Sequence, residues 1–176
     1  MNELYALEDL ARRIGERFDA AGLTLATAES CTAGLISGVL TMVPGASHWF
    51  LGGVVAYANE VKERVLGVPA GVLRGHGAVS EETVRAMALG ACRILGTRAA
   101  VAVSGVAGPG GGTREKPVGT VCLAVALDGQ VLSETRSFAG DRHAIRQATV
   151  ETALHLIARG LDRLTAKAPE AAETPQ

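Results

Sequence analysis

Aromatic residues, lysine and cysteine are all scarce in this sequence. Aromatic residues make up only 3% of the 176 residues, although 48% are hydrophobic. A folded core must therefore be built from alanine, valine, leucine and isoleucine. A chain of this length is predicted to form one domain with a sizeable core.

Other absences exclude whole classes of function. The formal net charge is −1 and there is no long basic run, which argues against a nucleic acid or an anionic membrane as the main partner. No apolar stretch reaches the ~18 residues of a membrane span, and no flank resembles a signal peptide. The cysteines, Cys31, Cys92 and Cys122, are odd in number and widely spaced, which favours a reducing, cytoplasmic compartment. Since there is no CxxC pair and no HExxH motif, we expect no dedicated zinc site.

Strand and helix patterns alternate along the chain until a hairpin signal, Asp128-Gly129, interrupts them. The predicted helices are Asn2–Ala21, Cys31–Met42, Asn59–Leu66, Ser80–Leu95 and one that begins at Gly140-Asp141, with Asn2, Asn59 and Ser80 as N-caps and 69–77 as a loop with at most one helical turn. The predicted strands are Leu23–Ala28, Gly53–Ala58, Ala99–Ser104, Val118–Leu127 and Gln130–Phe138. This order predicts an α/β fold, a three-layer α/β/α sandwich around a mixed, mostly parallel sheet with one antiparallel hairpin strand. Residues 1–164 would form this single domain and residues 165–176 a disordered tail.

Ser30 is the candidate nucleophile. It follows a predicted strand and begins a predicted helix, so its hydroxyl would face the ligand edge of the sheet, and the helix amides could stabilise an oxyanion. A serine at this place is equally well explained as an N-cap. Cys31 is a rival nucleophile, although a small residue packed at the helix start explains it better. Glu29 either binds nearby amides or is solvated.

Lys62 is the candidate general base. The other lysines, Lys116 and Lys167, fall in a glycine-rich loop and in the predicted tail. A lysine in the first turn of a helix faces the positive end of the helix dipole, and this position together with partial burial would lower its pKa. A surface lysine is the alternative. Tyr57 ends the preceding strand, where it either assists the reaction with its hydroxyl or fills the core.

The loop from Gly105 to Pro117 is rich in glycine and leaves backbone amides free to bind an anion. It is neither a P-loop nor a dinucleotide fingerprint, and a mobile loop is the alternative. Ser104 and Thr113 add hydroxyls, and Arg142 and Arg146 at the start of the last helix could bind a phosphate. A Ser-His-Asp triad with a loop histidine such as His76 stays open, although no GxSxG elbow is present.

Several of these segments resemble, in the same order, the C-terminal domain of the CinA family and its stand-alone relatives, the nicotinamide-nucleotide amidases. The segments are Ala28-Glu29-Ser30-Cys31-Thr32, Gly53-Val54-Val55-Ala56-Tyr57, Asn59-Glu60 with Lys62, Gly75-His76-Gly77-Ala78-Val79-Ser80, the loop from Ser104-Gly105 to Lys116-Pro117-Val118-Gly119-Thr120, and Gly140-Asp141-Arg142. The match covers roughly residues 20 to 160. It departs from the family at Ala33, where many relatives have glycine, and at Ser104, where many have threonine.

The resemblance implies an amidohydrolase that converts nicotinamide mononucleotide to nicotinate mononucleotide and ammonia, in pyridine nucleotide recycling. It implies Ser30 as nucleophile, Lys62 as base and Tyr57 as an assisting group, without metal or cofactor. The substrate-binding residues that it implies are Cys31, Thr32, Ser104, Gly108, Gly110, Gly111 and Arg142. It also implies a homodimer that binds a pyridine mononucleotide, while the charge argues, as above, for no nucleic acid and no membrane as partners. An amidase for another amide and a nucleotide-binding module without catalysis remain alternatives.

Overall fold

A five-stranded mixed sheet forms the centre of the molecule in the computed structural model, which describes residues 6–166. The strands are β1 (Leu25–Glu29), β2 (Phe50–Val55), β3 (Ala99–Gly105), β4 (Thr120–Leu127) and β5 (Gln130–Ser137), in the order β2-β1-β3-β4-β5. β1 pairs in parallel with β2 and β3, whereas β4 runs antiparallel to both β3 and β5. The predicted mixed α/β sheet is confirmed. The description "mostly parallel" holds for the strand directions, because only β4 runs opposite to the other strands. It does not hold for neighbouring strands, since parallel and antiparallel pairs are equally frequent.

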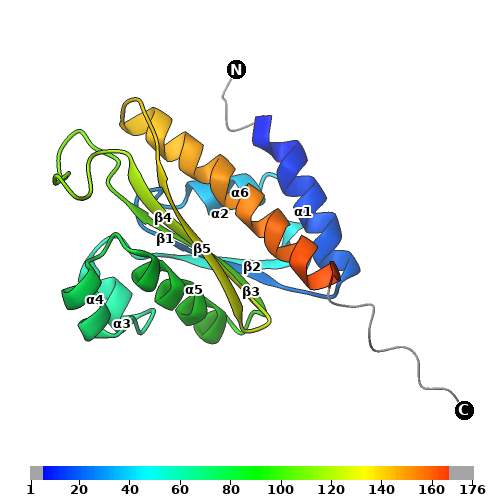
Figure 1. Cartoon of the computed structure of the whole chain (residues 1–176). Helices are drawn as coiled ribbons and strands as arrows, with labels where there is room; N and C mark the ends of the chain where they lie inside the picture. Colours follow the sequence, from blue (N-terminus) through cyan, green and yellow to red (C-terminus); the bar gives the residue numbers. More distant parts are fainter. Residues whose placement is uncertain (1–5, 167–176) are drawn as a thin grey trace, which may run out of the picture.

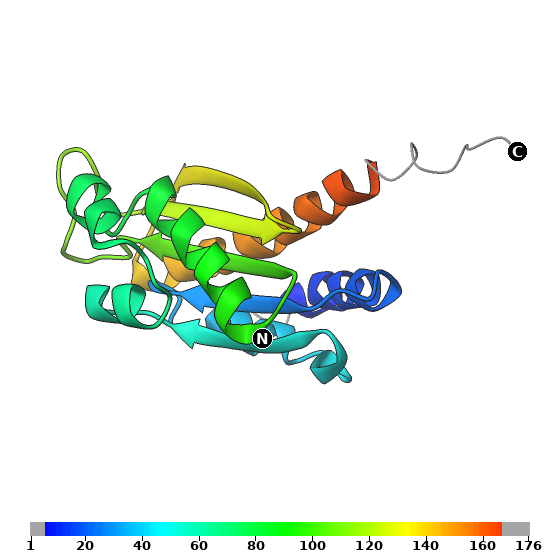
Figure 2. The same ribbon diagram turned by 90° about the horizontal axis from the view of Figure 1, so that it is seen from below.

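Helices cover both faces of the sheet, as Figure 1 shows. The helices are α1 (Glu8–Ala20), α2 (Leu35–Leu40), α3 (Asn59–Arg64), α4 (Ala70–His76), α5 (Glu81–Leu95) and α6 (Arg142–Ala166), with a short 3-10 helix at Ala46–His48. α1, α2 and α6 lie on one face, and α3, α4 and α5 lie on the other (Figures 1 and 2). In the part of the chain described, no helix is long and apolar enough to cross a bilayer.

Small side chains on one face of the central strands bring α5 close to the sheet. Alternation along β1 and β3 places alanines on the α5 face, and larger residues such as Leu25 and Val101 on the α6 face. α5 also passes tightly against the end of the α3 segment, because a Cβ added to Gly90 would lie 2.0 Å from the Leu66 carbonyl oxygen. The close approach of the α5 backbone to the sheet and to the α3 segment thus compensates for the small number of aromatic side chains in the core.

The hairpin and the start of α5 are confirmed. Leu127 pairs with Gln130 across the turn, where Asp128 and Gly129 have φ of +49° and +77°, as a type I′ turn requires. The Ser80 hydroxyl caps α5 by accepting a hydrogen bond from the Thr83 amide. In both places the local residue chemistry is sufficient to set the backbone.

Several predicted boundaries are wrong. α1 begins at Glu8, well after Asn2, which lies outside the described residues. α2 begins at Leu35 after a turn, so Ser30 is not its N-cap. Asn59 is the first residue of α3 and caps nothing with its side chain. These errors share a cause. Serine and asparagine cap helices, but they also suit the turns that precede helices, so their presence does not locate the first residue of a helix.

Two further segments differ from the expectation. The predicted loop at 69–77 contains the helix α4, which Pro69 precedes and Gly77 follows, the arrangement in which proline and glycine delimit a helix. α6 continues to Ala166, two residues past the predicted domain end at 164. The rest of the predicted tail, residues 167–176, lies outside the described part of the chain.

Candidate active site

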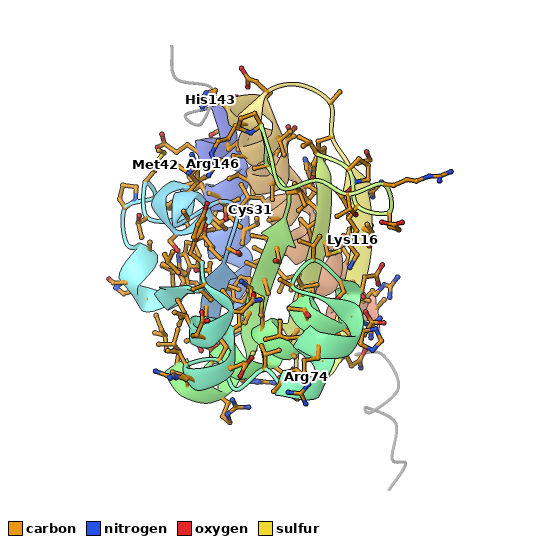
Figure 3. The ribbon with its side chains drawn as sticks, turned by 90° about the vertical axis from the view of Figure 1, so that its left-hand side faces the viewer. Cys31, Met42, Arg74, Lys116, His143 and Arg146 are labelled. Carbon is orange, nitrogen blue, oxygen red and sulfur yellow. The ribbon has the colours of Figure 1, made fainter. Side chains whose placement is uncertain are left out.

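The carboxyl ends of the parallel strands bring the predicted catalytic residues to one end of the molecule, which Figure 3 views. Ser30 follows β1, Tyr57 follows β2, and Ser104 lies near the end of β3. Together they border a cleft of about 200 Å³. The complete lining is Ser30, Cys31, Tyr57, Asn59, Lys62, Ala78, Val79, Ser104, Gly105, Ala107 and Arg142.

Ser30 and Lys62 contact each other at the bottom of this cleft. The Lys62 Nζ lies 3.3 Å from the Ser30 Oγ. The Lys62 side chain is buried, with 1% of its surface exposed, and Ser30 is 7% exposed. Ala56, directly after β2, still pairs with the end of β1, since its amide donates to the Glu29 carbonyl. α3 then starts from that point and returns Lys62 to Ser30.

The remaining partners of the Lys62 Nζ determine what this contact can do. The Nζ donates to the backbone carbonyls of Ala56, at 2.9 Å, and Tyr57, at 3.3 Å. A neutral amine has two N–H groups and one lone pair. If the two carbonyls accept both N–H groups, the lone pair is left for the hydroxyl hydrogen of Ser30. An ammonium can equally donate to all three oxygens, so the contacts fit both charge states, and the lowered pKa of Lys62 is what favours the neutral amine.

Burial lowers the pKa of Lys62, while the Cys31 thiol and the Glu60 carboxylate act in the opposite direction. No carboxylate of the described residues forms an ion pair with Lys62 within 4.0 Å. The expected contribution of the helix dipole is not supported, since α3 has six residues and Lys62 belongs to its last turn. Desolvation is thus the main reason for a neutral amine at this site.

Glu29 fixes the turn that presents Ser30. Its carboxylate is completely buried and accepts five hydrogen bonds. The donors are the hydroxyls of Thr32 and Ser37 and the amides of Gly34, Ile36 and Ser37. Glu29 therefore caps α2, and the alternative of a solvated side chain is wrong. The first amides of α2 are occupied and cannot form the oxyanion site that we expected from them.

The same turn contains strained backbone. Ala33 has φ of +52° and Gly34 has φ of +95°. The left-handed conformation costs a residue with a Cβ roughly 1 kcal/mol, so glycine suits position 33 better than alanine does. The hydrogen bonds to Glu29 on both sides of Ala33 hold this conformation in place.

We expect Glu29→Gln to lower the free energy of unfolding by about 3 kcal/mol. The glutamine amide group would meet N–H and O–H donors on both sides and could accept at only one oxygen. Urea titration of the variant against Glu63→Gln measures the effect. Glu63 is exposed on α3, and its replacement should change stability by less than about 0.5 kcal/mol. Equal stability of the two variants would contradict the capping role.

Cys31 is buried, and burial raises the pKa of its thiol to about 12. The thiol is therefore neutral at physiological pH and a poor nucleophile. The backbone amides of Cys31 and Thr32 face its sulfur and act to lower its pKa. These amides precede α2 and are not bound by Glu29. This environment favours the packing role of Cys31 over the nucleophilic one.

Arg142 also borders the cleft. Its guanidinium donates to the Gly108 carbonyl at 2.9 Å and to the Tyr57 hydroxyl at 3.3 Å. Within residues 6–166 it has no carboxylate partner within 4.0 Å. Tyr57 is 60% exposed, so it does not fill the core. Arg142 is an uncompensated cation beside the cleft, at the first turn of the long helix α6.

Other predicted site residues lie outside the cleft lining. The Thr32 hydroxyl is bound by Glu29, and Gly110 and Gly111 lie farther along the loop. Gly108 contributes its carbonyl to Arg142. His76 lies on α4, where its Nδ1 is 3.4 Å from Glu82, and it does not border the cleft with Ser30.

The structure also adds residues that we had not assigned to the site. Asn59, Ala78 and Val79 line the cleft, and all three fall in segments quoted for the family resemblance, which was the available signal. Arg146 stabilises the turn that contains Ser30 by donating a hydrogen bond to the Thr32 carbonyl at 2.9 Å. Figure 3 shows Arg146 next to Cys31. Its buried Nε has no hydrogen-bond partner among the described residues.

Comparison with known proteins identifies the family. The CinA C-terminal domain model matches residues 7–161. This chain belongs to the CinA C-terminal domain family. It is 51% identical over 142 residues to a CinA-like protein of Mycolicibacterium gilvum, covering 80% of this chain and 34% of that protein. It is 44% identical over 162 residues to a putative competence-damage inducible protein of Desulforudis audaxviator, covering 91% and 39%.

The chain thus spans little more than a third of the length of these curated relatives. Solved structures of similar length confirm the fold of this family member. The competence/damage inducible protein CihA of Agrobacterium tumefaciens has a TM-score of 0.84 at 47% identity, covering 89% of this chain and 95% of that one. A CinA superfamily protein of Enterobacter cloacae has a TM-score of 0.85 at 34% identity, covering 88% and 92%.

Proposed function

We propose that this CinA-family domain hydrolyses the carboxamide of nicotinamide mononucleotide to nicotinate mononucleotide and ammonia. The contact between the Lys62 Nζ and the Ser30 Oγ is the observation that supports it most. A buried serine that faces an amine with a lowered pKa is one of the nucleophile and base pairs that can perform acyl transfer from an amide. The family to which the chain belongs includes amidases, which agrees with this chemistry.

In the proposed reaction, the Ser30 Oγ forms a bond to the amide carbon while its proton moves to the Lys62 Nζ. The tetrahedral intermediate breaks its carbon–nitrogen bond, and Lys62 returns the proton to the leaving nitrogen, which departs as ammonia. Water then attacks the ester on Ser30, with Lys62 again accepting a proton. The second tetrahedral intermediate then breaks its bond to the Ser30 Oγ, which takes the proton back from Lys62, and the product leaves as the carboxylate after its acid proton passes to solvent.

The backbone amides of Cys31 and Thr32 are our candidates for binding the oxyanion. They lie next to Ser30, and they are not among the amides that Glu29 binds. Amides fixed in the turn would stabilise the developing charge without reorganisation. Arg146 holds the Thr32 carbonyl and thereby fixes the orientation of this turn.

The cleft and Arg142 support a small anionic substrate. A space of about 200 Å³ suits the pyridine ring and its carboxamide better than a complete nucleotide, since pockets for drug-sized ligands start near 300 Å³. The ribose and phosphate would then lie toward the open side. Arg142, which has no acidic partner, is our candidate for the phosphate.

Ammonia release from nicotinamide mononucleotide by the purified protein tests the proposal. We expect turnover with the mononucleotide and much less with free nicotinamide, which lacks the phosphate for Arg142. Binding of the mononucleotide without ammonia release would favour a non-catalytic nucleotide-binding module. Absence of binding would favour an amidase for another amide. Either result would reject the proposed function.

The pH dependence of turnover tests the electrostatics of Lys62. Because only the neutral amine accepts the serine proton, the rate should fall as the pH drops through the pKa of Lys62. The Glu60 carboxylate raises that pKa, so Glu60→Gln should move the acidic limb of the pH–rate profile to lower pH. Glu63→Gln, on the same helix, is the matched control and should leave the limb in place. A shift to higher pH with Glu60→Gln would contradict this assignment.

A further inference from the structure

A second hollow, larger than the candidate active site, lies beside it. Its volume is about 710 Å³, against about 200 Å³ for the cleft that contains Ser30. Val79 lines both spaces, so they adjoin at this residue. Figure 3 views this end of the molecule and labels Cys31 at the cleft and Lys116 at the hollow. The proposed reaction with a primary amide uses the cleft and leaves the hollow without a role.

A row of polar side chains leads from the cleft into the hollow. Ser104 on β3 pairs with Cys122 on β4, and Cys122 pairs with Thr135 on β5. Residues opposite each other on neighbouring strands direct their side chains to the same face of a sheet, which here is the face covered by α5. Ser30 faces the same side, since it contacts Lys62 of α3. Ser104 borders the cleft, whereas Cys122 and Thr135 border the hollow.

The spacing of the strands determines how far a ligand must extend to reach the hollow. Neighbouring strands lie about 4.8 Å apart, so Cys122 is about 10 Å from Ser30 along the row. A ligand that places its reacting carbonyl at Ser30 therefore reaches the hollow with an arm of about five carbon atoms.

The hollow favours a positively charged group. Its lining contains three carboxylates and two permanent cations, which are Glu81, Glu82, Glu115, Arg85 and Lys116, and His76 adds a positive charge only when it is protonated. Burial raises the pKa of the Cys122 thiol, and a hydrogen bond with Thr135 lowers it. Of the charged groups around this thiol, Glu81 and Glu82 raise that pKa and Lys116 lowers it. The negative charges therefore prevail near Cys122, which disfavours a phosphate there.

We propose that the hollow binds the leaving amine of an N-substituted carboxamide, and that the domain hydrolyses such secondary amides when the amine carries a second, positively charged group. This inference rests on the proposed acyl transfer at Ser30. In that reaction Arg142 holds the phosphate of the acyl part, so the substituent on the amide nitrogen is the arm that remains for the hollow. Lys62, which protonates the leaving nitrogen, lies on the same face of the sheet as the row.

The chemistry differs from that of a primary amide only in the leaving group. The Ser30 Oγ forms a bond to the carbonyl carbon, and its proton passes to the Lys62 Nζ. The carbon–nitrogen bond then breaks, and the leaving nitrogen takes that proton. The products of this step are the ester on Ser30 and a free amine in place of ammonia. Water cleaves the ester as it does after the primary amide.

Two secondary amides of equal length test the proposal, the N-aminopentyl and the N-hexyl amides of nicotinamide mononucleotide. Chromatography measures the formation of nicotinate mononucleotide from both amides and from nicotinamide mononucleotide itself. We expect kcat/KM for the aminopentyl amide within about tenfold of that for the mononucleotide, and about fivefold lower for the uncharged hexyl amide, the size of an exposed ion-pair effect.

The outcomes separate this inference from the proposed function. Turnover of the mononucleotide without hydrolysis of the aminopentyl amide would overturn the inference alone, and so would equal rates for the two secondary amides. Hydrolysis of none of the three compounds would overturn the inference and the proposed function together. Hydrolysis of the aminopentyl amide alone would support the hollow and reject the primary amide as substrate.

Thr135→Trp tests where the arm lies. Thr135 is at the far end of the row and borders the hollow, so an indole there should reduce the ratio of aminopentyl-amide to mononucleotide turnover at least about tenfold. Arg136→Trp is the matched control, because Arg136 directs its side chain to the opposite face of β5, and its ratio should stay normal. Circular dichroism establishes that both variants fold. Equal ratios for the two variants would contradict the placement of the arm.

Discussion

Ser30→Ala should bind nicotinamide mononucleotide yet release ammonia at least about 1,000-fold more slowly than the unmodified protein. The substitution removes only the Oγ that is to attack the amide carbon. The backbone of residue 30 would keep its hydrogen bonds to Val103 and Ala33, and Glu29 would still cap α2. The turn should therefore keep its shape, and binding should change by less than about threefold.

Ammonia release together with calorimetric binding measures both quantities on the same preparation. Ser137→Ala, an exposed serine at the end of β5, is the control and should turn over normally. Turnover by Ser30→Ala within tenfold of normal would reject Ser30 as the nucleophile. Loss of both binding and folding would instead assign Ser30 a structural role.

Lys62→Arg should also release ammonia at least about 1,000-fold more slowly than the unmodified protein, although arginine preserves the positive charge that lysine can have. Arginine stays protonated at any pH near neutrality, so it has no lone pair for the serine proton. A role of Lys62 as a permanent cation would predict the opposite result.

Lys116→Arg is the matched control for this variant. The Lys116 Nζ donates to the His76 carbonyl outside the cleft, at 2.7 Å, and arginine can make the same contact. We expect turnover within about twofold of normal for Lys116→Arg. Steady-state rates at several pH values compare the variants, and appreciable activity of Lys62→Arg would be incompatible with a neutral base.

Part of the candidate site could be predicted from the positions of residues relative to the predicted strands, and part could not. Ser30, Tyr57 and Ser104 follow or end predicted strands, so their meeting at one edge of a parallel sheet could be inferred. Asp128-Gly129 set the hairpin through local conformational preference. The proximity of Lys62 to Ser30 came from the family resemblance, since no local pattern determines how far α3 folds back.

The role of Glu29 could not be predicted, because it depends on burial. A glutamate next to a serine suggests solvation as readily as capping. Only the packed turn shows that its carboxylate replaces the expected serine cap and occupies the amides of α2. Because the turn between Ser30 and Leu35 could not be predicted either, α2 begins several residues later than expected. The lowered pKa of Lys62 was expected from the helix dipole, but its cause is desolvation, because α3 is short and Lys62 lies in its last turn.

The ionisation of Lys62 is the central claim, and NMR of protein labelled with ¹³C in lysine measures it directly. Only Lys62, Lys116 and Lys167 would give signals, and loss of one signal in Lys62→Arg assigns it. The account predicts that the Cε signal of Lys62 titrates at clearly lower pH than the other two. Titration of all three together, near the value of about 10.4 for a solvated lysine, would contradict it.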